Sequence, residues 1–339
     1  MQNVNKKDSR QHNRFRAVNA VFAVILLLMA VLIVALNLDK WMNRVDGGKS
    51  EKELELEMRT VYLKNEPYLW KESMTNWVII GLDRNGTMEP SDAYYNTDQA
   101  DFILVVSVDD EAKKVSFVQI NRDTMTRVSR LGVTGEKYEI ATEQIALSHT
   151  YGDGMATSCL NTTEAVSKFL KGLKTDRYVC VTMEAVPVLT DALGGVDVTL
   201  DGDYHELDET YSEGKTVRMD GDRAMAFIRA RAEMDDPTNV ARMGRQKLFM
   251  NSALERLKGR ENFSTDFALS LYEKLNPYMI TDASTGDIKT LADCVREYSH
   301  GPIRTPEGRS EVGEEFMEFY ADDDDLSGII AEIFCDKKE

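Results

Sequence analysis

The sequence predicts a layered α-β-α domain on a central mixed sheet, preceded by a single N-terminal transmembrane helix. Short apolar, β-branched runs alternate with amphipathic segments from about residue 76 onward, and this alternation is typical of α/β domains. Residues 17–38 contain no charged side chain, which indicates a membrane span. The 339 residues, 42% of them hydrophobic and 29% charged, are enough for a folded domain with a substantial core.

The uncharged stretch is long enough to cross a bilayer. In a helix that rises about 1.5 Å per residue, residues 17–38 span roughly 33 Å. A cleaved signal peptide would have a shorter apolar run followed by a small-residue cleavage site, and no clear site of this kind precedes Asp39. Basic side chains dominate residues 1–16, so we expect a cell-membrane protein with a cytoplasmic N-terminus and an extracellular C-terminal domain.

The segment after the span is polar. Glu, Lys and Leu interleave in residues 39–75, which predicts an extracellular helical stalk with a solvated charged face that ends near Pro67. The folded domain is then predicted at residues 76–339.

The elements of this domain follow from local patterns. The predicted strands are apolar runs rich in β-branched residues, at 77–83, 101–110, 115–120, 177–183 and 196–200. The predicted helices have apolar residues at helical spacing, at 157–173, in a segment ending near 193, and at 221–231, 241–257, 266–275, 287–298 and 326–334. The segment 221–231 also fits a helix–strand junction.

Composition excludes several functional classes. The net charge is −17, because 58 acidic residues outnumber 41 basic ones, and this disfavours nucleic-acid binding, which depends on neutralising phosphates. The sequence has no C-x-x-C pair, no zinc-binding helix spacing, no Walker loop and no G-x-S-x-G turn. Extracellular cysteines can form disulfides, so disulfide pairing and buried free thiols both stay open for Cys159, Cys180, Cys294 and Cys335.

Arginines gather in two segments of this acidic chain. Arg122 and Asp123 directly follow a predicted strand, a usual place for functional side chains in α/β folds. The second group comprises Arg229, Arg231, Arg242, Arg245 and Gln246. Alternate arginines share a side if the backbone is extended, and residues four apart share a helix face. Several converging guanidiniums indicate a polyanionic ligand, since their planar forks match phosphate oxygens, whereas surface ion pairs are the alternative.

Two carboxylates flank the same region. Asp83 ends one predicted strand and Asp101 begins the next, so both can reach one edge of the sheet. Carboxylates beside arginines suit a Mg²⁺ site when the ligand contributes phosphate oxygens. The alternative for each aspartate alone is a turn or a helix cap.

Six motifs in order resemble those of LytR-CpsA-Psr proteins. They are GLD (81–83), QADFILVVSV (99–108), INRDTM (120–125), LTDALGGVDV (189–198), DGDRAMAFIRAR (220–231) and RMGRQ (242–246). The resemblance implies a membrane-anchored phosphotransferase that takes a glycopolymer (teichoic acid, capsule or another wall polysaccharide) from a polyprenyl-pyrophosphate carrier and attaches it to peptidoglycan. It also implies a fold with a groove for the polyprenyl tail.

The resemblance assigns roles to individual residues. It implies pyrophosphate binding by Arg122, Arg229, Arg231, Arg242 and Gln246. It implies Mg²⁺ (or Mn²⁺) binding by Asp83 and Asp101, and a catalytic group of Asp101, Arg122 and Asp123. Arginines with a divalent cation stabilise the negative charge that spreads during phosphoryl transfer, and Asp101 can accept the proton of the acceptor hydroxyl.

The sequence departs from the family pattern at two positions. Gln99 stands where an arginine is common, and Gln144 stands where a lysine is common. Two missing cations weaken anion binding unless Arg84, Arg127 or Arg130 replaces them. Two further functions therefore stay open. The same site can hydrolyse the pyrophosphate, or the domain can bind lipid or polymer as a non-catalytic regulator of envelope assembly.

Overall fold

The computed structural model describes residues 51–91, 96–230, 238–258, 264–314 and 316–337. The chain divides into two units, Met1–Thr60 and Val61–Glu339. In the first unit the structure describes one helix, α2 (Glu51–Met58). The predicted transmembrane helix and the basic N-terminus lie outside the described residues. Within the described ranges, no helix has both the length and the apolar character needed to span a membrane.

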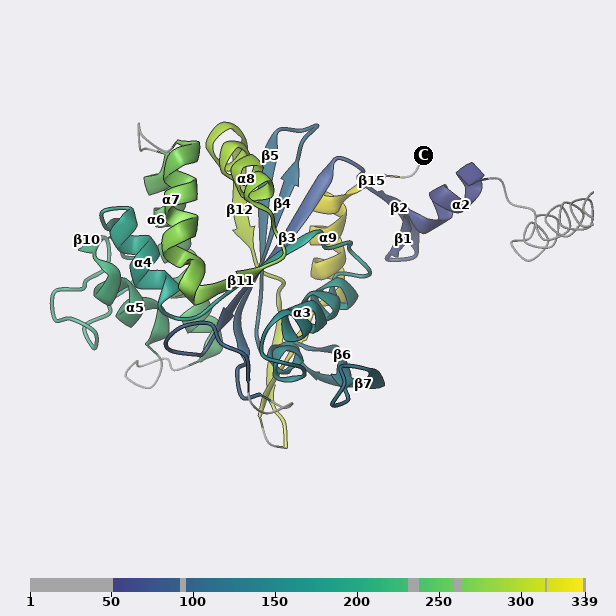
Figure 1. Ribbon diagram of the computed structural model, residues 1–339, viewed down its shortest axis with the longest axis horizontal. Coiled ribbons are helices and arrows are strands. Elements are labelled where there is room, and N and C mark those ends of the chain that lie inside the picture. Colours follow the sequence, from purple (N-terminus) through teal and green to yellow (C-terminus); the bar gives the residue numbers. More distant parts are fainter. Residues whose placement is uncertain (1–50, 92–95, 231–237, 259–263, 315, 338–339) are drawn as a thin grey trace, which may run out of the picture. The chain divides into compact units, whose positions relative to one another are not determined.

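A six-stranded mixed sheet forms the centre of the second unit (Figure 1). Its strands, in spatial order, are β11 (Met279–Thr281), β8 (Arg177–Val181), β3 (Met74–Leu82), β4 (Ala100–Asp109), β5 (Lys114–Ile120) and β12 (Ser299–Arg304). Strand β3 runs parallel to β8 and β5 parallel to β12, whereas the other neighbours are antiparallel. The predicted α/β fold with a central mixed sheet is thus confirmed.

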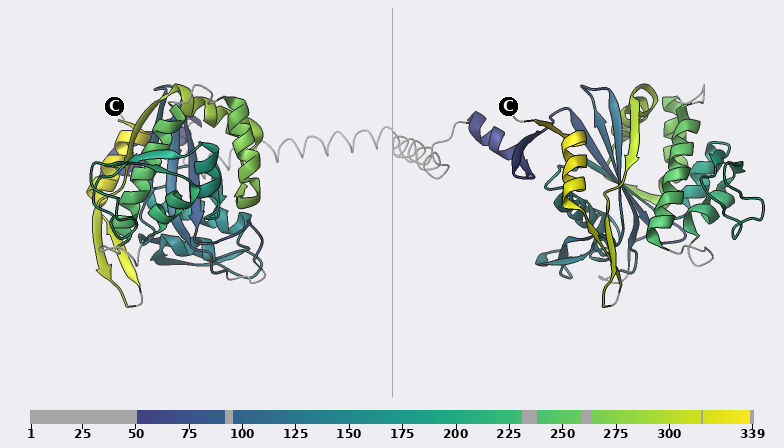
Figure 2. Two further views of the ribbon diagram at one scale, coloured as in Figure 1. Left: turned by 90° about the vertical axis from the view of Figure 1, so that its left-hand side faces the viewer. Right: turned by 180° about the vertical axis from the view of Figure 1, so that it is seen from behind.

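Helices cover both faces of this sheet (Figures 1 and 2). One face packs against α3 (Ala156–Phe169) and α9 (Asp323–Phe334), and the other against α6 (Asn239–Lys258) and α8 (Thr285–Glu297). Alternation along β4 supplies both cores, because Ile103 points into the first layer and Leu104 into the second. The sequences of its central strands are nearly continuous apolar runs, because both faces of the sheet are buried.

A third core lies at the side of the sheet, against α6 and α7 (Thr265–Leu275). It is built from β9 (Val196–Thr199), β10 (Thr216–Met219), α4 (Ala185–Ala192) and α5 (Gly221–Arg229). Its centre is Phe227, which is fully buried and meets Tyr204 edge to face. This core fixes the C-terminal end of α5, where Arg229 lies.

Two hairpins lie at the end of the sheet where β5 finishes (Figures 1 and 2). The first joins β6 (Met125–Leu131) to β7 (Lys137–Gln144) and leads into a 3-10 turn, η1 (Ile145–Thr150). The second joins β13 (Gly308–Val312) to β14 (Met317–Ala321). Strand β14 is attached by the amide of Phe319, which donates to the carbonyl oxygen of Asp123 at 2.9 Å. A second 3-10 turn, η2 (Asn276–Tyr278), precedes β11.

The predicted helical stalk is wrong for residues 60–70. These residues form β1 (Thr60–Leu63) and β2 (Glu66–Trp70), which join β15 (Cys335–Lys337) in a three-stranded sheet. Val61 and Leu63 are buried whereas Tyr62 is exposed, a period of two that belongs to a strand. The partner strand comes from the other end of the chain, so no local sequence pattern indicates the pairing. The polar composition of the segment favoured a solvated helix instead.

Candidate functional site

A β-bulge places Asp101 at the end of the sheet where β4 begins. Gly81 of β3 pairs with Phe102, but the next residue, Leu82, pairs with Ala100, so Asp101 is the extra residue on β4. Bulges of this kind interrupt the ladder and re-aim a side chain, and they are frequent beside active sites. The amide of Asp83 continues the shifted register by donating to the carbonyl oxygen of Gln99 at 3.4 Å.

Arg122 meets Asp101 across the end of the β4–β5 pair. Ile103 pairs with Ile120, so continuing the antiparallel register by two residues places Arg122 opposite Asp101. Its Nη1 forms an ion pair with Oδ1 of Asp101, and its Nη2 donates to Oε1 of Gln99 at 2.7 Å. Only 16% of the Arg122 side chain and 13% of the Asp101 side chain are exposed, so the pair is weakly screened by solvent.

Arg242 reaches the same carboxylate from the first turns of α6. Its Nη1 lies 3.2 Å from Oδ2 of Asp101, and its Nη2 donates to Oδ1 of Asn239 at 2.7 Å. The side-chain amide of Asn239 donates in turn to Oδ1 of Asn121 at 2.7 Å. The predicted convergence of Arg122 and Arg242 is therefore observed, with each oxygen of Asp101 bound to one guanidinium.

Asp123 is held between Arg122 and Gln144. Its Oδ1 lies 3.3 Å from Nε of Arg122 and accepts a hydrogen bond from Nε2 of Gln144 at 3.1 Å. Gln144 also donates to the carbonyl oxygen of Met317 on β14 at 2.6 Å. Thus Asp123 orients the guanidinium of Arg122. Gln144, which stands where the family commonly has a lysine, supports Asp123 by a hydrogen bond from its uncharged amide.

In the described residues, no other predicted pyrophosphate ligand is seen to contact Asp101. Arg229, at the end of α5, lies 3.4 Å from Asp83, and both side chains are about half exposed. Gln246 accepts a hydrogen bond from Gln119 of β5 at 3.1 Å. Arg231 lies outside the described residues. The extended backbone that would align residues 229 and 231 is not found at Arg229, because this residue is the last of a helix.

Arg245 has a structural role. Its side chain turns inward, donates to the carbonyl oxygen of Phe227 at 3.1 Å, and also donates to that of Ala230. It is 2% exposed, so it ties α6 to the C-terminal end of α5.

Two of the three arginines considered as replacement cations are already paired with carboxylates. Arg84 lies 3.1 Å from Asp98, and Arg130 forms ion pairs with Glu139 and Glu143 on β7. Hydrogen bonding to Glu143 is the main cause that raises the pKa of Arg130. The third, Arg127, is exposed on β6.

Arg122, Arg242, Asp101 and Asp123 form the arginine cluster, and their formal charges sum to zero. Arg122 and Arg242 face the carboxylates of Asp101 and Asp123, and the outlying pair of Arg229 and Asp83 balances as well. A phosphate entering this group would exchange carboxylate partners for phosphate oxygens, since guanidinium forks match both anions. Among the described residues, the cluster therefore gains a net positive charge only if a cation joins it.

Three uncharged members of the network were not predicted: Asn121, Asn239 and Gln119. Asn121 lies within the INRD motif, and its position directly after a strand was the signal that could have identified it. Beside it, a cavity of about 450 Å³ lies between α6 and the β13–β14 hairpin. Its apolar lining comes from Val240, Met243, Pro306 and Phe319.

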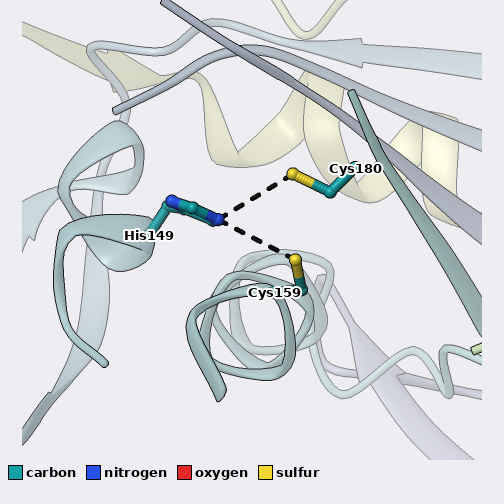
Figure 3. A group of neighbouring side chains, drawn as sticks. All are labelled: His149, Cys159 and Cys180. Atoms are coloured by element: carbon teal, nitrogen blue, oxygen red, sulfur yellow. Dashed lines mark hydrogen bonds between the residues drawn. The ribbon is translucent and has the colours of Figure 1, made fainter. Parts of the chain in front are cut away.

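A second group of titratable side chains lies in the core between the central sheet and α3. His149, Cys159 and Cys180 are fully buried, and both cysteines are free thiols (Figure 3). A hydrogen bond from Cys180 lowers the pKa of the Cys159 thiol, and burial raises the pKa of Cys180. Cys294 and Cys335 are also free and buried, so the question left open by the sequence is answered in favour of thiols.

Several curated proteins are similar to this chain. A polyisoprenyl-teichoic acid–peptidoglycan teichoic acid transferase, TagU of Enterococcus faecalis, is 22% identical over 282 residues, which is 80% of each chain. The corresponding transferase TagV of Bacillus subtilis is 28% identical over 173 residues, 49% of this chain and 41% of that protein. Biofilm regulatory protein A of Streptococcus mutans is 27% identical over 196 residues, 55% of this chain and 45% of that protein. The chain thus spans about half the length of several curated relatives that it matches.

Solved structures show the same fold. The crystal structure of B. subtilis TagV aligns with a TM-score of 0.58 at 21% identity, covering 77% of this chain and 97% of that one. The structure of TagT bound to LIIa-WTA aligns with a TM-score of 0.58 at 16% identity, covering 77% and 89%. The model of the LytR_cpsA_psr family matches residues 40–315. The chain therefore belongs to the LytR_cpsA_psr family.

Proposed function

We propose that this protein transfers a glycopolymer from a polyprenyl-pyrophosphate carrier to peptidoglycan. The observation that carries the proposal is the convergence of Arg122 and Arg242, from two separate elements, on the bulged residue Asp101. Both guanidiniums are mostly buried, and buried arginine forks suit a phosphate ligand. Relatives of this chain are named as teichoic acid transferases, which supports a wall polymer as the transferred group.

In the proposed reaction, phosphate oxygens replace the carboxylate oxygens that now bind the two arginines. The acceptor hydroxyl attacks the phosphorus that carries the sugar, and Asp101 takes the hydroxyl proton. The bond from this phosphorus to the bridging oxygen breaks, so polyprenyl phosphate leaves with that oxygen. Arg122 and Arg242 stabilise the negative charge that spreads over the phosphoryl group, and Asp123 keeps Arg122 oriented.

We propose Mg²⁺ (or Mn²⁺) as the cofactor. Asp83 and Asp101 would hold it, with phosphate oxygens of the substrate completing its shell. The balanced charges of the cluster favour this proposal, since a pyrophosphate brings negative charge that the described side chains do not offset. When bound, the cation would neutralise part of that charge during phosphoryl transfer.

Membrane anchoring belongs to the same proposal. A polyprenyl carrier stays in the bilayer, so an enzyme that uses it benefits from the anchor predicted at residues 17–38, with the catalytic domain outside the cell. The partly apolar cavity beside Asn121 offers one place for an apolar part of the substrate.

The test compares Arg122→Ala and Arg242→Ala with Arg296→Ala, an arginine in the last turn of α8 that pairs with Asp293 at 2.8 Å. Label on the glycopolymer of the lipid-linked substrate is followed into peptidoglycan. Each charge-assisted contact contributes about 1.5–3 kcal/mol, so we expect the two site variants to bind the lipid pyrophosphate roughly 10- to 150-fold more weakly.

The variant Arg296→Ala should transfer label normally, and circular dichroism should show all three variants folded. Release of labelled phosphorylated polymer into solution, with none in peptidoglycan, would identify a hydrolase instead. Normal lipid binding by both site variants would contradict the assignment of the arginine cluster. Normal binding by the parent protein with no turnover would favour the regulatory role suggested by the relative named a biofilm regulatory protein.

A further inference from the structure

Three side chains of the types that commonly bind metals meet in the core. His149 comes from η1, Cys159 from α3 and Cys180 from β8, and in Figure 3 both thiols point toward the imidazole. Nε2 of His149 lies 3.8 Å from each Sγ, and the three ligand atoms lie within 4.8 Å of one another. Among the described residues, no other group of three or more histidine, cysteine and acidic side chains meets in this way.

These distances match the edges of a metal coordination shell. Zinc binds imidazole nitrogen at about 2.0–2.1 Å and thiolate sulfur at about 2.3 Å. At bond angles between roughly 109° and 120°, those lengths separate the nitrogen from each sulfur by about 3.6–3.8 Å. A zinc ion placed among the three atoms therefore requires little movement of the side chains.

The imidazole is oriented as a metal ligand would be. Nδ1 of His149 lies 2.9 Å from the carbonyl oxygen of Asp98. A carbonyl only accepts hydrogen bonds, so Nδ1 carries the proton and the lone pair of Nε2 faces the two thiols. Metal-binding histidines commonly donate their second ring nitrogen to a carbonyl in this way, which fixes the tautomer.

We propose that His149, Cys159 and Cys180 form a buried zinc site. Binding Zn²⁺ displaces the proton of each thiol that is still protonated and forms two Zn–S bonds and one Zn–N bond. The assembly of one Zn²⁺, two thiolates and one neutral imidazole carries no net charge, which suits a site without solvent exposure. Three protein ligands leave a fourth position, which water holds in zinc sites with three protein ligands. This proposal does not rest on the arginine cluster or on the transferase proposal.

Such a site would brace the segment that leads into β4. Asp98 binds His149 through its carbonyl oxygen and Arg84 through its carboxylate, and Gln99 and Asp101 follow it in the chain. The zinc would also tie α3 and η1 to β8 in the central sheet. We therefore expect metal binding to raise the thermal stability of the whole domain, because the ion binds the folded state preferentially.

The experiment uses the full chain, kept reduced and stripped of metal, and titrates it with Zn²⁺ in competition with a chromophoric chelator. We expect one equivalent bound per chain, release of the thiol protons present at the working pH, and a higher melting temperature. Cys159→Ser and Cys180→Ser should each weaken Zn²⁺ binding by at least a hundredfold. Cys294→Ser, which changes a buried thiol in another core cluster, should bind as the parent protein does.

Co²⁺ provides a second measurement that does not depend on variants. In the parent chain it should produce an intense sulfur-to-cobalt charge-transfer band, which Zn²⁺ then removes. Absence of this band, or lack of Zn²⁺ uptake by the reduced parent chain, would overturn the proposal. Equal uptake by both serine variants would do the same. Recovery of a Cys159–Cys180 disulfide from protein isolated without reductant would assign the pair to a covalent link instead.

Discussion

Asp101 is the residue on which the proposed site depends most. Each of its carboxylate oxygens is bound to a different arginine, and its side chain is only 13% exposed. An aspartate that neutralises two buried guanidiniums keeps them oriented before substrate arrives. Removing one partner from such a cluster leaves a buried charge without compensation, and this usually destabilises the fold by more than the intact pair stabilised it. Because Asp101 is itself an anion, it holds the two arginines in the free protein in an arrangement that suits an anionic ligand.

Gln99 permits a test of how charge at this site sets affinity. Its Oε1 accepts a hydrogen bond from Arg122, so a side chain at this position faces the cluster. We expect Gln99→Arg to bind a polyprenyl pyrophosphate at least several-fold more tightly. At an effective dielectric of about 20, two unit charges 4 Å apart interact by roughly 4 kcal/mol before desolvation, which leaves a measurable net gain. The added cation also repels Arg122, so the free variant should be less stable.

The control for this substitution is Gln99→Met, which removes the hydrogen-bond acceptor without adding charge. Affinities of the three proteins are compared at fixed ionic strength, with and without Mg²⁺. Equal affinity of Gln99→Arg and the parent protein in both conditions would mean that residue 99 does not contact the head group.

At the scale of single elements, chain ends and irregularities position the functional groups. The bulge in β4 turns Asp101 out of the ladder, and the first turns of α6 carry Arg242 and Asn239 to the same end of the sheet. Helix α8 shows how such elements are anchored. Its N-terminus has a capping box in which Ser284 and Asp287 each bind the other's backbone amide. Asp287 also pairs with Arg177 of β8, which ties the helix to the sheet.

The capping box predicts a pH dependence of stability. The hydrogen bond from Ser284, followed by the bond from Arg177, lowers the pKa of Asp287 to about 2. A carboxyl whose pKa is lower in the folded state stabilises the fold above its unfolded pKa of about 4, and this contribution disappears as the pH falls toward 2. We expect Asp287→Asn to unfold at lower urea concentration at pH 7, with a difference from the parent that shrinks between pH 4 and pH 2.

Asp293→Asn serves as the matched control, since Asp293 lies on the same helix and pairs with Arg296 at the surface. It removes one negative charge without disturbing the cap. If the two variants lose equal stability at pH 7, net charge rather than the capping box explains the effect.

At the scale of the whole molecule, the two ends of the folded unit close on each other. Strand β2 pairs with β15, so Trp70 faces Cys335 across the ladder. Val61 and Leu63 of β1 join the core between the central sheet and helices α3 and α9. Residues 61–70 are therefore part of the domain core and not a separate spacer.

This closure predicts where the domain can be shortened. A chain of residues 61–339 should fold as stably as one of residues 51–339. A chain of residues 74–339 loses two buried aliphatic side chains, each worth about 1.5–3 kcal/mol, and should be less stable by roughly 3–6 kcal/mol. Urea unfolding of the three chains measures the difference. Equal stability of the two shorter chains would show that β1 and β2 contribute little to the fold.

Elements whose pattern is local could be predicted from the sequence. The strands at 77–83, 101–110 and 115–120 and the helices that cover them match β3, β4, β5, α3, α6, α8 and α9 within a few residues. Their hydrophobic periodicity depends only on neighbours along the chain. The two segments that carry Arg122 and Arg242 could also be predicted from a local feature, because their arginines cluster in an acidic chain. The anchor at residues 17–38 stays a prediction.

Features that depend on strand register and on contacts between distant residues could be seen only in the folded protein. The bulge that presents Asp101 arises from how β3 pairs with β4, and the strands at residues 60–70 exist because β15 completes their sheet. The histidines and cysteines follow no metal-binding spacing in the sequence, yet His149, Cys159 and Cys180 meet because a turn, a helix and a strand share one core. Side-chain convergence of this kind is set by packing between elements, which local sequence patterns do not encode.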